Sequence, residues 1–140
     1  MRYGIDIFSG AGGLSLGAEM AGIRISTAIE INPHAAKTFL RNHKGAKVLQ
    51  GDIQDIAPQA LQSNKKPLFV IMGGPPCQGF SLSNTRTRNM KNKKNFLFLE
   101  FVRLVQKLRP EWFVLENAWG KKLSIRHNTN GNSILITRII

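Results

Sequence analysis

Residues 3–17 read YGIDIFSGAGGLSLG, a short and mostly apolar run that leads directly into a glycine-rich segment. The apolar run has the length and composition of a buried strand, and the glycines after it are typical of a tight turn. A helical pattern comes next and ends at Gly22, with one predicted face made of Leu14, Gly17, Met20 and Ala21. A strand, a glycine turn and a helix in this order predict the start of a β-α-β unit.

The rest of the chain continues the alternation of strands and helices. Further strands are predicted at residues 23–30, 46–53, 66–74 and 111–117, further helices at 34–43 and 95–108, and a turn or short helix at 54–64. Asn32 and Pro33 suit the N-cap and first position of the helix at 34–43. The helix at 95–108 has one apolar face, made of Leu97, Phe101, Leu104, Val105 and Leu108. The pattern predicts an α/β fold with a mostly parallel, doubly wound sheet of about five strands.

The composition limits the partners and the compartment of the protein. The 140 residues suit one domain, and 20 Lys and Arg residues against 8 Asp and Glu residues give a formal net charge of +12. This excess indicates an anionic partner, with nucleic acid the first candidate, and solubility alone explains it less well. The single cysteine excludes an internal disulfide, and residues 1–9 lack the apolar stretch of a signal peptide. No segment of the sequence approaches the ~20 apolar residues of a membrane helix, so we expect a soluble, cytoplasmic protein.

Polar or conformationally special residues follow each predicted strand. They are Ser9 to Gly13, Glu30, Asp52, Pro75 to Cys77, and Glu116 with Asn117. Because the carboxyl ends of parallel strands meet at one edge of a sheet, we expect these residues to surround one ligand site, although ordinary loops have a similar composition. Glu30 suits a ribose, whose hydroxyls a carboxylate binds, and Asp52 lies close to where an adenine would be. The pattern favours a nucleoside over a phosphate, because the sequence lacks the Lys–Ser/Thr pair of a P-loop.

Cys77 lies in the segment GGPPCQGFS, residues 73–81. A lone cysteine is most often a small buried apolar residue, but Pro75 and Pro76 stiffen this segment and nearby Lys and Arg residues favour the thiolate. Glu116 ends the strand at residues 111–117, which we expect to lie beside the strand that leads to Cys77. A thiolate and a carboxyl group next to a nucleoside site suit methylation of cytosine at C5. The thiolate adds to C6 and makes C5 nucleophilic, and the carboxyl group stabilises the adduct at N3.

Five sequence blocks between residues 3 and 117 resemble, in order, the characteristic blocks of the DNA cytosine-5 methyltransferases. They read DIFSGAGGLSLG, GDI, GGPPCQGFS, NFLFLEFVRLV and FVLEN. The resemblance implies a Rossmann-like methyltransferase fold, S-adenosylmethionine as cofactor, double-stranded DNA as substrate, no metal, and a restriction-modification or phage origin. It divides the chain into a partial catalytic lobe at residues 1–120 and a divergent tail at residues 121–140.

The resemblance also implies roles for individual residues. The expected cofactor contacts are Phe8, Ser9, Gly10, Gly13, Leu14, Glu30, Ile31, Asp52, Ile53 and Leu97. For catalysis it implies Cys77 as the nucleophile, Pro75 placing the base, and Glu116 at N3 with Asn117 beside it. The expected DNA contacts are Gln78, Ser81, Arg86, Arg88, Lys91, Lys93 and Lys94, although the basic stretch could also be a solvated loop.

The chain departs from the family after residue 117. Ala118 and Trp119 replace the usual Val and Pro, and beyond Gly120 the arginine-bearing strand and the target-recognition domain of the family are missing. The tail segment GNSI resembles the final family block, which makes Asn132 and Ser133 expected cofactor contacts unless the match is chance. We therefore expect little activity from this chain alone: it is either a degenerate or truncated product or one half of a split enzyme, whose second polypeptide would carry the target-recognition lobe. Two alternatives stay open: an RNA cytosine-5 methyltransferase, and a non-catalytic remnant that binds cofactor or DNA.

Overall fold

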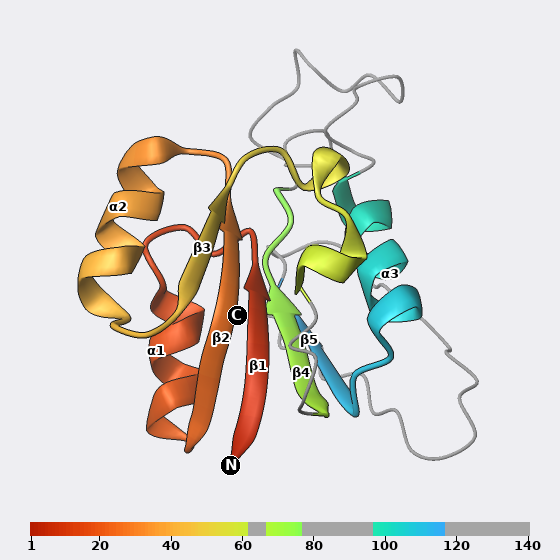
Figure 1. Ribbon diagram of the computed structural model, residues 1–140, viewed down its shortest axis with the longest axis horizontal. Helices are drawn as coiled ribbons and strands as arrows, with labels where there is room; N and C mark the ends of the chain where they lie inside the picture. The colour runs from red at the N-terminus through yellow and green to blue at the C-terminus, as the bar shows by residue number, and fades with distance from the viewer. Residues whose placement is uncertain (62–66, 77–96, 117–140) are drawn as a thin grey trace.

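The computed structural model describes residues 1–61, 67–76 and 97–116, which form a parallel sheet flanked by helices (Figure 1). The strands are β1 (Arg2–Ile7), β2 (Ile23–Glu30), β3 (Lys47–Gln50), β4 (Leu68–Gly73) and β5 (Trp112–Leu115). The helices are α1 (Gly13–Met20), α2 (Pro33–Asn42) and α3 (Leu97–Leu108), with short 3₁₀ helices η1 (Ile53–Asp55) and η2 (Pro58–Leu61). These elements confirm the predicted α/β alternation.

The sheet has the strand order β3-β2-β1-β4-β5, and every pairing between neighbouring strands is parallel. The chain moves outward from β1 through β2 to β3 and then crosses back to place β4 on the other side of β1. The strand order therefore reverses between β1 and β4, and the loops after these two strands leave in opposite directions. Ligands of open α/β sheets bind in the crevice that such a reversal creates.

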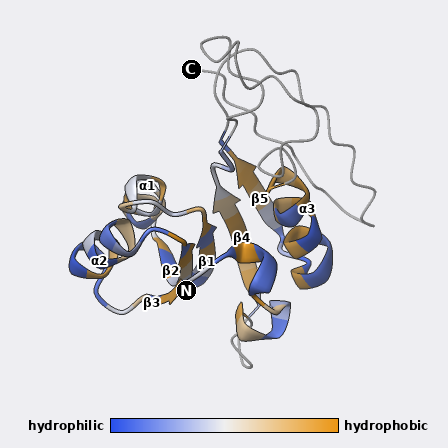
Figure 2. Cartoon of the chain, turned by 90° about the horizontal axis from the view of Figure 1, so that it is seen from above, coloured by the Kyte–Doolittle hydropathy of each residue, from blue (hydrophilic) through white to orange (hydrophobic). Residues whose placement is uncertain are grey.

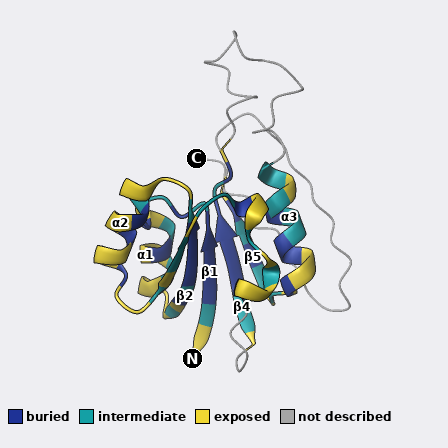
Figure 3. Ribbon diagram, turned by 45° about the horizontal axis from the view of Figure 1, so that its top comes forward, coloured by how far each residue is buried: buried dark blue, intermediate teal, exposed yellow. Residues whose placement is uncertain are grey.

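Helices lie on both faces of the sheet (Figure 2), and each face has its own apolar core. On one face, α3 and the 3₁₀ helices cover Ile5, Ile7 and Ile71 of the central strands, and the rings of Phe101 and Phe113 meet edge to face at 6.3 Å. On the other face, α1 and α2 cover a smaller core made of Ile25, Ala28, Phe39, Val70 and Met72. Most residues of the central strands are buried, and the helices turn their exposed surfaces outward (Figure 3).

Two helices match their predicted details. Asn32 is the N-cap of α2, where its Oδ1 accepts hydrogen bonds from the backbone N–H groups of His34 and Ala35, and Pro33 is the first helical residue. The predicted apolar face of α3 is the buried one: Phe101, Leu104, Val105 and Leu108 are buried, and Leu97 packs against the same core.

The predicted apolar face of α1 is wrong except for Leu14, which packs against the core that α1 and α2 cover. Met20 is 83% exposed, Gly17 and Ala21 are exposed, and the residue that α1 buries completely is Ser15. The physical reason is a hydrogen bond from the Ser15 hydroxyl to the buried carboxylate of Asp6, which turns this polar side of the helix toward the sheet. None of the helices in the part of the chain described by the structure is long and apolar enough to cross a membrane.

Candidate cofactor and catalytic site

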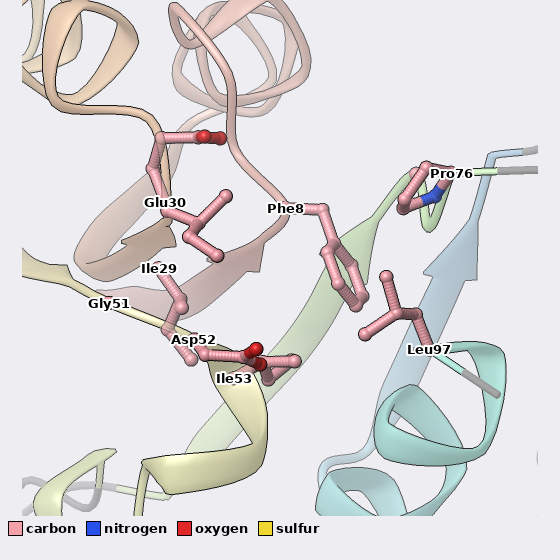
Figure 4. Close-up of a pocket in the computed structure, with 10 residues that line it drawn as sticks. Phe8, Ile29, Glu30, Gly51, Asp52, Ile53, Pro76 and Leu97 are labelled. Carbon is pink, nitrogen blue, oxygen red and sulfur yellow. The ribbon is translucent and has the colours of Figure 1, made fainter. Parts of the chain in front are cut away.

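A pocket of about 270 Å³ opens at the carboxyl ends of the strands, where the strand order reverses (Figure 4). Six of the expected cofactor contacts line it: Phe8, Glu30, Ile31, Asp52, Ile53 and Leu97. Ile29, Gly51, Gly74 and Pro76 also line it, and the sequence analysis did not single them out as cofactor contacts. Apolar walls and a small number of polar groups are typical of a small-molecule site.

Phe8 reaches the pocket through an unusual backbone conformation. Its φ of 64° lies in the left-handed region, which residues other than glycine rarely adopt. The next residue, Ser9, donates a backbone hydrogen bond to the Ile29 carbonyl at 3.0 Å and keeps the chain close to β2. The Phe8 ring then lies near Pro76 and Leu97 (Figure 4). Backbone strain of this kind concentrates at functional sites.

Two carboxylates are fixed at the edge of the pocket by backbone N–H groups. Glu30 accepts from Gly10 through Oε2 at 2.7 Å and from Asn32 through Oε1 at 2.8 Å. Asp52 is the N-cap of η1 and accepts from Gln54 at 3.0 Å. A carboxylate oxygen has more than one lone pair, so both groups retain the capacity to accept hydrogen bonds from the hydroxyl or amino groups of a ligand.

The glycine loop, residues 9–13, lies beside the pocket and is tied to it by the bond between Gly10 and Glu30. Gly10 and Gly12 have φ values of 55° and 98°, which require glycine-like freedom. Ser9 is buried, and its Oγ has no hydrogen-bond partner among the described residues. The expected contacts Ser9, Gly10, Gly13 and Leu14 do not line the pocket, so their role stays a prediction.

Asp6 is a buried carboxylate on β1 that the sequence analysis missed. Its side chain is 1% exposed, its Oδ2 accepts a hydrogen bond from the Ser15 hydroxyl at 2.5 Å, and its Oδ1 has no partner within the described ranges. Burial raises the pKa of Asp6 to about 6, and the hydrogen bond from Ser15 opposes this rise. A charged residue in the middle of the apolar run YGIDIF was the signal that could have identified it.

Asp6 is expected to make the stability of the fold depend on pH. Its pKa rises from 3.8 to about 6 on folding, so between these pH values the folded chain retains a proton that the unfolded chain has lost. The stabilisation from this proton is fully present below pH 3.8 and is lost as the pH rises through about 6. The total loss in the free energy of unfolding is roughly 3 kcal/mol. Denaturant titrations of the wild type and Asp6→Asn between these pH values measure the difference. If the free energy of unfolding depended on pH in the same way for the two proteins, the raised pKa of Asp6 would be contradicted.

The end of the site where we expect catalysis contains Glu116 at the end of β5 and the segment after β4. The Glu116 backbone N–H donates to the Gly73 carbonyl at 3.0 Å. Its side chain lies over Gly74, since a Cβ placed on Gly74 would be 2.6 Å from Glu116 Oε2. Pro75 is buried, and Pro76 lines the pocket. Glu116 therefore lies beside Gly74, the residue directly before the PPC segment, and its proximity to Cys77 stays a prediction.

The other predicted site residues lie outside the described residues. For catalysis these are Cys77 and Asn117, and for the tail they are Asn132 and Ser133. The predicted DNA contacts that lie outside are Gln78, Ser81, Arg86, Arg88, Lys91, Lys93 and Lys94. Their roles stay predictions.

Comparison with known sequences places this architecture in a family. The sequence model for C-5 cytosine-specific DNA methylase matches residues 3–136. The chain is 42% identical over 117 residues to the type II methyltransferase M1.HphI of Haemophilus parahaemolyticus, a match that covers 81% of the chain and 32% of the relative. It is 38% identical over 120 residues to the type II methyltransferase M.AquIA of Picosynechococcus, covering 83% of the chain and 48% of the relative.

Solved structures show the same relationship. A DNA modification methyltransferase encoded within an E. coli prophage superimposes with a TM-score of 0.73 at 38% identity, over 84% of this chain and 32% of that one. The Dnmt2 methyltransferase of S. pombe has a TM-score of 0.61 at 21% identity, over 84% of this chain and 34% of that one, and shares the fold. The chain thus spans about a third of the length of several relatives that it matches. With a family match over residues 3–136 and relatives at 42% identity, the chain belongs to the C-5 cytosine-specific DNA methylases.

Proposed function

We propose that this chain provides the cofactor site and the nucleophile of a DNA cytosine-5 methyltransferase that uses S-adenosylmethionine. One observation carries the proposal: the pocket that Glu30 and Asp52 border is also lined by Gly74, against which the Glu116 carboxylate lies. A nucleoside-type ligand and a target base would therefore meet at the reversal between β1 and β4. The type II methyltransferases among the relatives support a restriction-modification role.

The residues present fit S-adenosylmethionine. Ile29, Ile53 and Leu97 offer apolar walls, and the two carboxylates accept hydrogen bonds as the ribose and the adenine amino group require. The unpartnered Ser9 Oγ at the start of the glycine loop is a further polar group that a ligand would satisfy. When bound, this cofactor supplies an electrophilic methyl group.

Three residues of the chain would act on the target cytosine. The Cys77 thiolate forms a bond to C6 of an extruded cytosine, which makes C5 nucleophilic. Glu116 holds N3 and stabilises the charge that develops on the ring, and Pro75 helps to place the base. Release of the chain would then require a base to take the proton from C5 and the C6–S bond to break, which returns the Cys77 thiolate and restores the aromatic ring.

We further propose that residues 78–94 contact double-stranded DNA. This stretch contains Arg86, Arg88, Lys91, Lys93 and Lys94 and no acidic residue, and phosphate contacts from such side chains supply sequence-independent affinity. Target recognition then depends on parts of the relatives that the chain does not match, which a second polypeptide could carry. A cytoplasmic location suits both the DNA substrate and a free Cys77 thiol.

Replacing Glu30 tests the cofactor site. Glu30→Ala is expected to weaken S-adenosylmethionine binding by roughly 1–3 kcal/mol in calorimetry, because hydrogen bonds to a charged group are lost. Glu111→Ala is the matched control, since Glu111 is an exposed glutamate at the opposite end of β5 from the pocket. Equal affinities for the two variants would contradict the role of Glu30. Absence of binding by the folded wild type would contradict the cofactor assignment itself.

A further inference from the structure

His43 is a buried histidine beneath the glycine loop, directly after the last residue of α2. Its side chain is 2% exposed, and its Nδ1 lies 3.0 Å from Oε2 of Glu19 on α1. Because a carboxylate only accepts hydrogen bonds, Nδ1 is the donor. The ring also packs on Phe39, with centroids 4.4 Å apart and a 36° angle between the planes. Its position and orientation are therefore fixed from two sides.

The free edge of this ring supports the glycine loop. A Cβ placed on Gly12 would lie 2.1 Å from His43 Nε2 and 2.5 Å from Cδ2, so the backbone of Gly12 rests directly on the imidazole. Gly12 is the N-cap of α1. Its N–H donates to the Ser9 carbonyl at 3.0 Å, and its carbonyl accepts from Leu16 at 2.9 Å. Any displacement of the ring would therefore change where the loop ends and where α1 begins.

The loop is held at a second point on its other side. Glu30 accepts from the Gly10 N–H at 2.7 Å, and Glu30 also borders the pocket. The loop thus lies between Glu30, which borders the pocket, and His43, which lies in the interior. Ser9, with its buried and unpartnered hydroxyl, is at the start of this clamped segment.

We propose that His43 is a positioning residue that fixes the glycine loop and the start of α1 for the amino-acid half of the cofactor. The inference rests on the proposed function. The amino-acid half carries a carboxylate, which suits the backbone N–H groups and the positive end of the dipole at a helix N-terminus. The nucleoside half faces Glu30 and Asp52. Neither carboxylate contacts the His43 ring, and Glu30 keeps a second anchor outside the loop, the Asn32 N–H at 2.8 Å. Loss of this ring should therefore weaken the binding of the amino-acid half more than the binding of the nucleoside half.

Two cofactor analogues separate these halves. S-adenosylhomocysteine contains the nucleoside and the amino acid, whereas 5′-methylthioadenosine contains the same nucleoside and a neutral sulfur but no amino acid. His43→Asn places an amide nitrogen near the position of Nδ1 and removes Nε2, the ring atom that lies closest to Gly12. In calorimetry we expect it to bind S-adenosylhomocysteine about tenfold more weakly than the wild type does, and 5′-methylthioadenosine within about twofold. The matched control is His34→Asn, at an exposed position of α2, which should change neither affinity.

The outcomes separate this inference from the proposed function. Equal losses for the two analogues, or no loss for either, overturn the role of His43 while leaving the cofactor site in place. Failure of the wild type to bind either analogue overturns the proposed function as well. If His43→Asn does not fold, Glu19→Gln provides the test, because it keeps the ring and weakens the partner that orients it. This variant should show the same selective loss, about threefold, and unchanged selectivity overturns the proposal.

Discussion

Replacing Gly73 with alanine is expected to lower the free energy of unfolding by roughly 4 kcal/mol, a large part of the about 5–15 kcal/mol that stabilises a typical domain. Gly73 is the last residue of β4, and a Cβ at this position would lie 2.0 Å from the carbonyl oxygen of Ile7 on β1. The neighbouring atom belongs to the backbone, so no side-chain rotation relieves the overlap. The two central strands would have to separate, and the buried core on both faces would open with them.

Gly17→Ala is the matched control for this prediction. Gly17 is inside α1, and apart from its chain neighbours and the backbone of the helix itself no described atom lies within 4 Å of a Cβ placed there. Alanine stabilises a helix relative to glycine, so this variant should gain about 0.5–1 kcal/mol. Denaturant titration followed by circular dichroism measures both changes. A Gly73→Ala protein as stable as the wild type would show that the β1–β4 contact at the pocket is not as tight as the structure indicates.

The fold was predictable where it depends on local sequence. Asn32 and Pro33 indicate the start of α2 because capping involves only residues next to the helix end. The twelve residues of α3 are enough for a repeating apolar face, which packs as predicted. The face of α1 was not predictable in this way, because eight residues give a weaker pattern and the bond from Ser15 to Asp6 joins different elements.

The site was predictable from the ends of the strands and from the family resemblance, but only in part. Glu30 and Asp52 line the pocket as the strand-end rule predicts. Gly74 lines it because it has no side chain to fill the space, a property that depends on the path of the chain in three dimensions. The contact between His43 and Gly12 joins residues 31 positions apart, so it needed the arrangement of α1 and α2 around the loop.

Replacing Cys77 with serine is expected to abolish methyl transfer, a loss of roughly a thousandfold or more. A serine hydroxyl is far less ionised and less nucleophilic than a cysteine thiol, so it does not add to C6 at a useful rate. The wild-type chain alone is expected to be nearly inactive, because misplacing a bound base by about 1 Å costs on the order of 100-fold in rate. A polypeptide carrying the family regions that this chain does not match should restore turnover when it is added in trans.

The most direct measurement is covalent capture of the chain on DNA. DNA in which 5-fluorocytosine replaces the target base blocks the final loss of the C5 substituent, so the protein stays attached through C6. We expect the wild-type chain, supplied with S-adenosylmethionine and the complementing polypeptide, to form an adduct that mass spectrometry assigns to Cys77. The Cys77→Ser chain in the same mixture should form none. An equal yield of adduct from Cys77→Ser, or methyl transfer at the wild-type rate by that variant, would contradict the assignment of Cys77 as the nucleophile.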